Sequence, residues 1–177
     1  MSDLINSINL VLNFCKENNT KKLKCSSMPA KLATQQLQVI MKKVQTLIKL
    51  DNERYDINVS YGSGYFPKVP WVGITPRGKK VSNSISVCIC FSRVGEGIVC
   101  GAMFNEMKKS GSFATVKRDL LEKPYITLLG GAARTVYTHK FINPKDFYAN
   151  EIKEIELIAH LNDSIKILED YVRISIQ

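Results

Sequence analysis

The sequence has few of the residues that enzymes use at a catalytic or metal centre. It contains only two histidines, His139 and His160, and neither belongs to an HExxH pattern or to a Cys/His cluster with metal-ligand spacing. The glycines on either side of Ser63 lack the downstream lysine and hydroxyl of a phosphate-binding loop. A nuclease-like cluster of Asp with Glu-x-Lys after a strand is also absent. We therefore expect a binding protein with no catalytic residue, no metal and no cofactor.

The five cysteines form no CxxC pair, and no cationic, apolar leader precedes Asp3. This usage predicts a cytoplasmic protein whose thiols are small core side chains. No apolar run approaches the roughly 18 to 20 residues of a membrane span, so we expect no membrane partner. One alternative from another class stays open, a small cysteine-dependent enzyme in which Cys100 pairs with His139 in space.

Acidic residues are scarce over most of the chain. Lys and Arg outnumber Asp and Glu by 25 to 16, although residues 141–177 hold four bases and seven acids. The whole surplus of positive charge therefore lies in residues 1–140, as a surface that faces phosphates requires. Charge alone would equally suit an anionic membrane or an acidic protein.

Apolar residues repeat at helical spacing in three segments. The first runs from Leu4 to Cys15, the second from Pro29 to about Leu50, and the third from Ile152 to Val172. Ser2 or Asp3 is expected to cap the first of these helices. We also expect a helix near 113–121, on a weaker pattern.

Between these helices the apolar period changes to that of strands. Strands are predicted at 57–61, 69–74, 84–91 and 98–104, with extended segments at 135–138 and 140–142. The fold class is therefore α+β: a curved, mainly antiparallel sheet, or partly open barrel, flanked by N-terminal helices and a long C-terminal helix. With 177 residues and no linker, the chain is expected to form a single domain spanning 1–177.

Two loops combine aromatic rings, glycines and positive charge. The first places Tyr61, Tyr65 and Trp71 near two glycines and Lys68, a mixture that suits an unstacked base held beside a phosphate. In the second loop, charged and neutral phosphate donors occur together. These donors are Arg77, Lys79, Lys80, Ser82 and Asn83. The alternatives from local sequence are that Trp71 fills the core and that the second loop is a solvated turn.

Segment 59–74, VSYGSGYFPKVPWVGI, followed by SNSI at 82–85, resembles the N-terminal DNA-recognition domain of McrB-type restriction proteins. That family has a G-x-G-x-F-x-x-[IV]-P-W pattern before a polar loop and a strand. The resemblance implies binding to double-stranded DNA and rotation of a modified cytosine into an aromatic-walled pocket. It also implies two partners, a GTP-driven AAA+ motor and a nuclease subunit.

The base pocket that the resemblance implies comprises Ser63, Tyr65, Trp71, Ser86 and Cys90. Trp71 matches the pocket tryptophan of the family, whereas both serines stand where a cytosine-reading member carries tyrosines. Replacing two rings by hydroxymethyl groups enlarges such a pocket and makes it more polar. We hypothesise a bulkier or more polar target, such as hydroxymethylated or glycosylated cytosine or a purine, unless Tyr65 restores a small pocket.

A second alternative is a protein-interaction module. It would use the acidic face of the last helix and the exposed aromatic side chains, and its binding would be insensitive to salt. The loop composition favours DNA over this alternative and over the cysteine-dependent enzyme.

Overall fold

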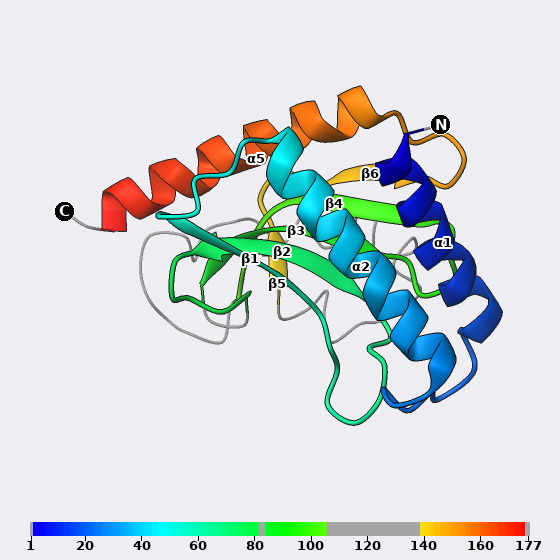
Figure 1. Cartoon of the computed structure of the whole chain (residues 1–177). Coiled ribbons are helices and arrows are strands. Elements are labelled where there is room, and N and C mark those ends of the chain that lie inside the picture. Colours follow the sequence, from blue (N-terminus) through cyan, green and yellow to red (C-terminus); the bar gives the residue numbers. More distant parts are fainter. Residues whose placement is uncertain (1, 82–83, 106–138, 176–177) are drawn as a thin grey trace.

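A computed structural model of the chain describes residues 2–81, 84–105 and 139–175. Six strands form one twisted sheet in the order β1-β2-β3-β4-β5, and β6 also pairs with β4 (Figure 1). Every pair in the described sheet is antiparallel, and its edges do not meet to close a barrel. Helices α1, α2 and α5 pack on one face. The predicted α+β class, with N-terminal helices and a long C-terminal helix, is confirmed.

The three helices form where apolar stripes recur at helical spacing. They are α1 (Asp3–Asn18), α2 (Met28–Leu47) and α5 (Glu154–Ser175). Ser2 caps α1, because its hydroxyl accepts a hydrogen bond from the Ile5 amide at 3.3 Å. Pro29 lies in the first turn of α2, where its missing N–H costs no hydrogen bond. All three predicted helices are confirmed to within a few residues at their ends.

The strands are β1 (Tyr55–Val59), β2 (Trp71–Pro76), β3 (Ile85–Phe91), β4 (Gly97–Asn105), β5 (His139–Phe141) and β6 (Lys145–Tyr148). The first four and β5 match predicted strands. Strand β6 was not predicted, since its four residues give too short a pattern to distinguish it from a loop. The helix expected near 113–121 and the extended segment expected at 135–138 lie outside the described residues.

Strand β3 is buried along its whole length because side chains pack on both of its faces. Ile85, Val87, Ile89 and Phe91 belong to the core beneath the helices. Cys88 and Cys90 belong to a second apolar cluster on the opposite face of the sheet. Val69, Val81, Val99, Met103 and Phe141 complete that cluster, and Trp71 packs against it. The candidate site described below is built at the edge of this second face.

A partly buried polar network connects α5 to β4. The Asn143 Oδ1 accepts a hydrogen bond from the Ala102 amide at 2.7 Å, while the Asn143 Nδ2 donates to the Ser164 hydroxyl at 2.9 Å. Ser164 in turn donates to the His160 carbonyl at 2.8 Å. The His160 Nε2 lies 3.0 Å from the Cys100 carbonyl, which can only accept, so Nε2 carries the proton. Asn143 thus replaces a missing strand partner for Ala102.

Candidate nucleic-acid interface

An open hollow of about 510 Å³ lies beside the Trp71 side chain at the start of β2. Tyr61, Trp71, Lys79 and Lys80 line it, together with Asn58, Val59, Gly78 and Val81. The Trp71 amide donates to the Ser60 hydroxyl at 2.9 Å, which fixes the backbone at the mouth of the hollow. Four residues from the two predicted loops therefore meet around a single space.

Gly73 lets the Trp71 ring lie against the sheet. A Cβ atom at position 73 would fall 3.2 Å from Cζ3 of Trp71 and 2.8 Å from Cγ2 of Val81. The ring therefore occupies space that any other residue at this position would fill. Trp71 is partly buried and packs on the second cluster, with one side left toward the hollow. One side of the ring is thus packed against the apolar cluster, while the other side can contact a ligand in the hollow.

Of the three basic residues at 77–80 in the connection between β2 and β3, only two line the hollow. Lys79 and Lys80 are exposed and line it. Arg77 turns the other way, since its NH1 lies 3.3 Å from the Glu53 carbonyl and 3.5 Å from the Asn52 carbonyl. Its part in DNA binding stays a prediction, as do those of Ser82 and Asn83, which lie outside the described residues.

The five predicted base-pocket residues do not all lie together. Ser86 and Cys90 point to the second face of β3 and are fully buried, at 0% and 1% exposure. Ser63 and Tyr65 are exposed in the β1–β2 loop and do not line the hollow. Only Trp71 is both in the predicted set and at the hollow. A pocket made by all five would require the second face of the sheet to open.

The β1–β2 loop is held in place by the segment between α1 and α2. The Phe66 amide donates to the Leu23 carbonyl at 2.8 Å, and the Cys25 amide donates to the Gly64 carbonyl at 3.1 Å. The Lys22 ammonium lies 4.4 Å from the centroid of the Tyr65 ring, a cation–π contact. These contacts hold the two segments together and place Lys22 beside Tyr65.

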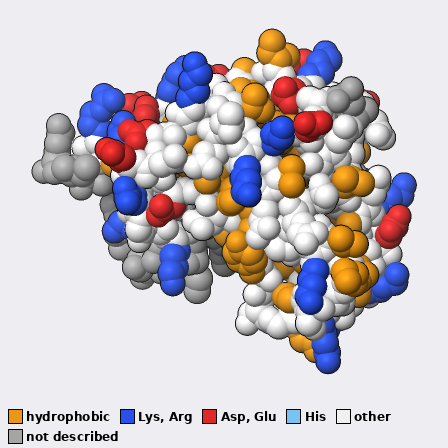
Figure 2. All heavy atoms as spheres, viewed as in Figure 1, with side chains coloured by type: hydrophobic (Ala, Val, Ile, Leu, Met, Phe, Trp, Pro, Cys, Tyr) orange, Lys and Arg blue, Asp and Glu red, His pale blue; other side chains and the backbone are white. Residues whose placement is uncertain are grey.

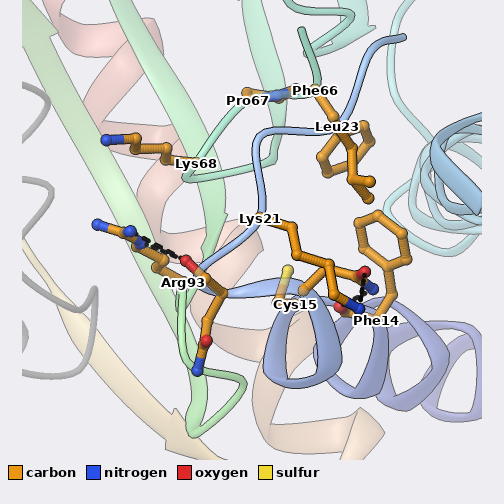
Figure 3. Close-up of a pocket in the computed structure, with 10 residues that line it drawn as sticks. Phe14, Cys15, Lys21, Leu23, Phe66, Pro67, Lys68 and Arg93 are labelled. Carbon is orange, nitrogen blue, oxygen red and sulfur yellow. Dashed lines mark hydrogen bonds between the residues drawn. The ribbon is translucent and has the colours of Figure 1, made fainter. Parts of the chain in front are cut away.

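A second, smaller cavity of about 40 Å³ lies where this loop meets α1 (Figure 3). Phe14 and Phe66 form its apolar wall, with ring centroids 5.0 Å apart in an edge-to-face contact. Lys21, Lys68 and Arg93 supply its charge, and the described residues that line it include no acid. Lys68, predicted to contact DNA, therefore belongs to this cavity and not to the hollow beside Trp71.

Positive charge dominates this end of the molecule because two long segments lack acids altogether. Neither residues 18–50 nor residues 57–95 contain an Asp or a Glu. At the lowest part of the view in Figure 2, where Figure 1 places the β1–β2 loop, the visible charged side chains are Lys or Arg. Arg93 was missed as a candidate by the sequence analysis, although the second acid-free segment contains it. Such a surface attracts polyanions.

Four of the five thiols are poorly suited to nucleophilic chemistry. Cys15, Cys88, Cys90 and Cys100 are buried. Burial raises the pKa of Cys15 and of Cys88 to about 12, and it also raises the pKa of Cys90 and of Cys100. A thiol with a raised pKa stays protonated at neutral pH, whereas the thiolate is the nucleophile.

The partner proposed for Cys100 in the alternative enzyme is not placed, since the His139 side chain lies outside the described side chains. Among the described side chains, His160 approaches Cys100, and it contacts the backbone carbonyl. Within residues 2–81, 84–105 and 139–175, no three His, Cys, Asp or Glu side chains gather closely enough to hold a metal ion. In that same part of the chain, no helix has the length and apolar character needed to cross a membrane.

The chain matches no protein-family model, no curated protein and no solved structure.

Proposed function

We propose that this protein binds double-stranded DNA and reads a modified base, which it turns out of the duplex against Trp71. The observation that carries the proposal is the convergence of Trp71, Tyr61, Lys79 and Lys80 on one open hollow. Its volume of about 510 Å³ falls in the range of small-molecule pockets, about 300–1,000 Å³. A flat ring beside two ammonium groups matches the two faces of a nucleotide, its base and its phosphate.

The energies of such a reaction are close to balance. Extrusion of a base from the duplex costs about a few kcal/mol, and stacking on an aromatic ring returns about 1–3 kcal/mol. Contacts between Lys or Arg and phosphates supply the remaining affinity through release of counterions. A buried methyl group adds only about 0.8 kcal/mol, so strong preference for a modification would need hydrogen bonds as well. Asn58, which lines the hollow, offers a side-chain amide for this purpose.

The identity of the modified base and the place of the protein in a restriction system form the finer part of the proposal. Modified cytosine, the AAA+ motor and the nuclease subunit rest on the likeness to the McrB-type domain. Ser63 and Ser86 do not line the hollow, so the expected preference for a polar modification over plain 5-methylcytosine would depend on other groups there, such as the Asn58 amide. A panel of duplexes that differ only in one base, with methyl-, hydroxymethyl- and glucosylated cytosine and methylated adenine, would identify the target.

Lys79→Ala and Lys80→Ala test the phosphate contacts of the hollow. Each variant is expected to weaken binding to modified and unmodified duplexes alike, because phosphates carry no sequence information. Each lost phosphate contact should reduce the slope of log K against log salt by about 0.9. Titrations at several salt concentrations measure this slope. Lys166→Ala, an exposed lysine on α5 with the same change of charge, is the control. Equal slopes for all four proteins would exclude these lysines from the interface.

A further inference from the structure

The small cavity beside α1 differs from the Trp71 hollow in both size and charge. Its volume is about 40 Å³, against about 510 Å³ for the hollow. Pockets for small molecules are commonly about 300–1,000 Å³, and a space of about 40 Å³ is too small to enclose a nucleobase. Its charged lining consists of Lys21, Lys68 and Arg93. The cavity therefore suits the oxygens of one small anion and not a base or a nucleoside.

The Arg93 guanidinium is held in one orientation by an uncharged group, the Asn19 carbonyl. Its Nε and NH2 donate to the Asn19 carbonyl at 3.1 Å and 2.9 Å. A guanidinium has five N–H donors, and these bonds use two of them. The carbonyl carries no net charge, so it fixes the plane of the guanidinium without neutralising it. Arginine in a fixed plane is the preferred partner for the paired oxygens of phosphate or carboxylate groups.

Lys68 lies in the β1–β2 loop, before the start of β2, and reaches the same cavity. Trp71 pairs with Cys90, and the Phe91 amide then donates to the Pro70 carbonyl at 2.9 Å. Continuing this antiparallel order brings the chain near Lys68 opposite the chain near Arg93. Figure 3 shows both side chains extending in the same direction, away from the contact between the two phenylalanine rings. Two positive charges from different segments are thus presented side by side.

We propose that Lys68 and Arg93 together hold one phosphate of the DNA backbone, as an anchor separate from the hollow at Trp71. This inference rests on the proposed function. Three residues of chain reach at most about 11 Å, which limits the separation of the Lys68 and Trp71 backbones. Since one DNA strand rises about 3.4 Å per nucleotide, we expect the anchored phosphate within a few nucleotides of the extruded base. The anchor fixes the register of the duplex on the protein and carries no base specificity.

The double variant Lys68→Ala with Arg93→Gln tests the anchor. Glutamine retains an amide that can donate to the Asn19 carbonyl, so the turn after β3 keeps its support. The salt slope should fall by about 0.9, the value for one lost phosphate, while the ratio of affinities for modified and unmodified duplexes stays unchanged. The control is the double variant Lys153→Ala with Lys166→Ala, which removes the same charge. Both lysines are exposed; Lys153 lies just before α5 and Lys166 lies on it.

A neutral phosphate analogue locates the contact. Duplexes with one methylphosphonate, placed at successive positions two to four nucleotides from the modified base, should bind the wild type weakly at one position. At that position the double variant should show no additional loss, because the interaction is already absent. Equal losses in both proteins at every position would overturn the anchor.

Different experimental results would overturn the phosphate anchor and the proposed DNA binding. An unchanged salt slope in the Lys68/Arg93 variant, with Lys79→Ala and Lys80→Ala still weakening binding, overturns the anchor and leaves the proposed function standing. If the wild type binds no DNA, the proposed function fails and the anchor on DNA fails with it. Tighter binding to phosphatidylglycerol vesicles than to DNA would also overturn the assignment to the DNA backbone.

Discussion

Replacing Trp71 by alanine is expected to weaken binding to the modified duplex by about 5- to 150-fold, the equivalent of 1–3 kcal/mol of lost base stacking. Binding to an unmodified duplex should change much less, because that duplex keeps its bases stacked and relies on phosphate contacts. Affinities for both duplexes at one salt concentration measure the effect. Trp71→Phe, which keeps a flat ring, should retain most of the preference.

The Trp71→Ala result needs a stability control, because the ring also packs on the second apolar cluster. Thermal unfolding of each variant shows whether the fold survives. Gly73→Ala is an independent test, since it retains the tryptophan residue but puts a Cβ 3.2 Å from its ring and so displaces the ring or its neighbours. A loss of preference in both variants, with folded protein, supports stacking. An unchanged preference in folded Trp71→Ala would mean that the base is read elsewhere.

Replacing Asn143 by alanine is expected to destabilise the protein by about 2–4 kcal/mol. The change leaves the buried Ala102 amide without its acceptor, which costs about 1–3 kcal/mol, and removes a second hydrogen bond worth about 1 kcal/mol. For a chain of this size, each kcal/mol shifts the melting temperature by about 2–4 °C. Calorimetry should therefore record a decrease of roughly 4–16 °C.

Asn13→Ala, at an exposed position of α1, is the matched control and should leave the melting temperature nearly unchanged. A decrease of less than about 2 °C for Asn143→Ala would contradict the role of the network in fastening α5 to β4. Retained DNA binding below the melting temperature would separate this structural role from the interface.

The sequence predicts correctly those helices and strands whose apolar residues repeat at regular spacing along the chain. The stripes Leu4–Cys15 and Ile152–Val172 predict helices because one face of each is buried against a single core. Strand β6 was not predicted because it is defined by its pairing with β4, which is far away in the sequence. The alternation of apolar and polar residues in β6 is too short to indicate a strand unless its pairing partner is known.

The candidate site was predictable only in part, for a similar reason. Loop composition identified Trp71, Lys79 and Lys80, which the fold brings together at the hollow. The alternation of β3 could not reveal that Ser86 and Cys90 are buried, since both faces of that strand are covered. Arg93 gains its significance from the Asn19 carbonyl, 74 residues away in sequence, and no local pattern indicates such a partner.

Fluorescence of Trp71 during DNA titration tests the account most directly, because it is the only tryptophan in the chain. Every change in tryptophan emission therefore reports on this hollow. Stacking of an extruded base on the indole should quench its emission saturably with a duplex that carries the preferred modification. An unmodified duplex, bound to the same extent, should leave the emission nearly unchanged. Equal quenching by both duplexes, or full binding of the modified duplex without quenching, would contradict base extrusion against Trp71.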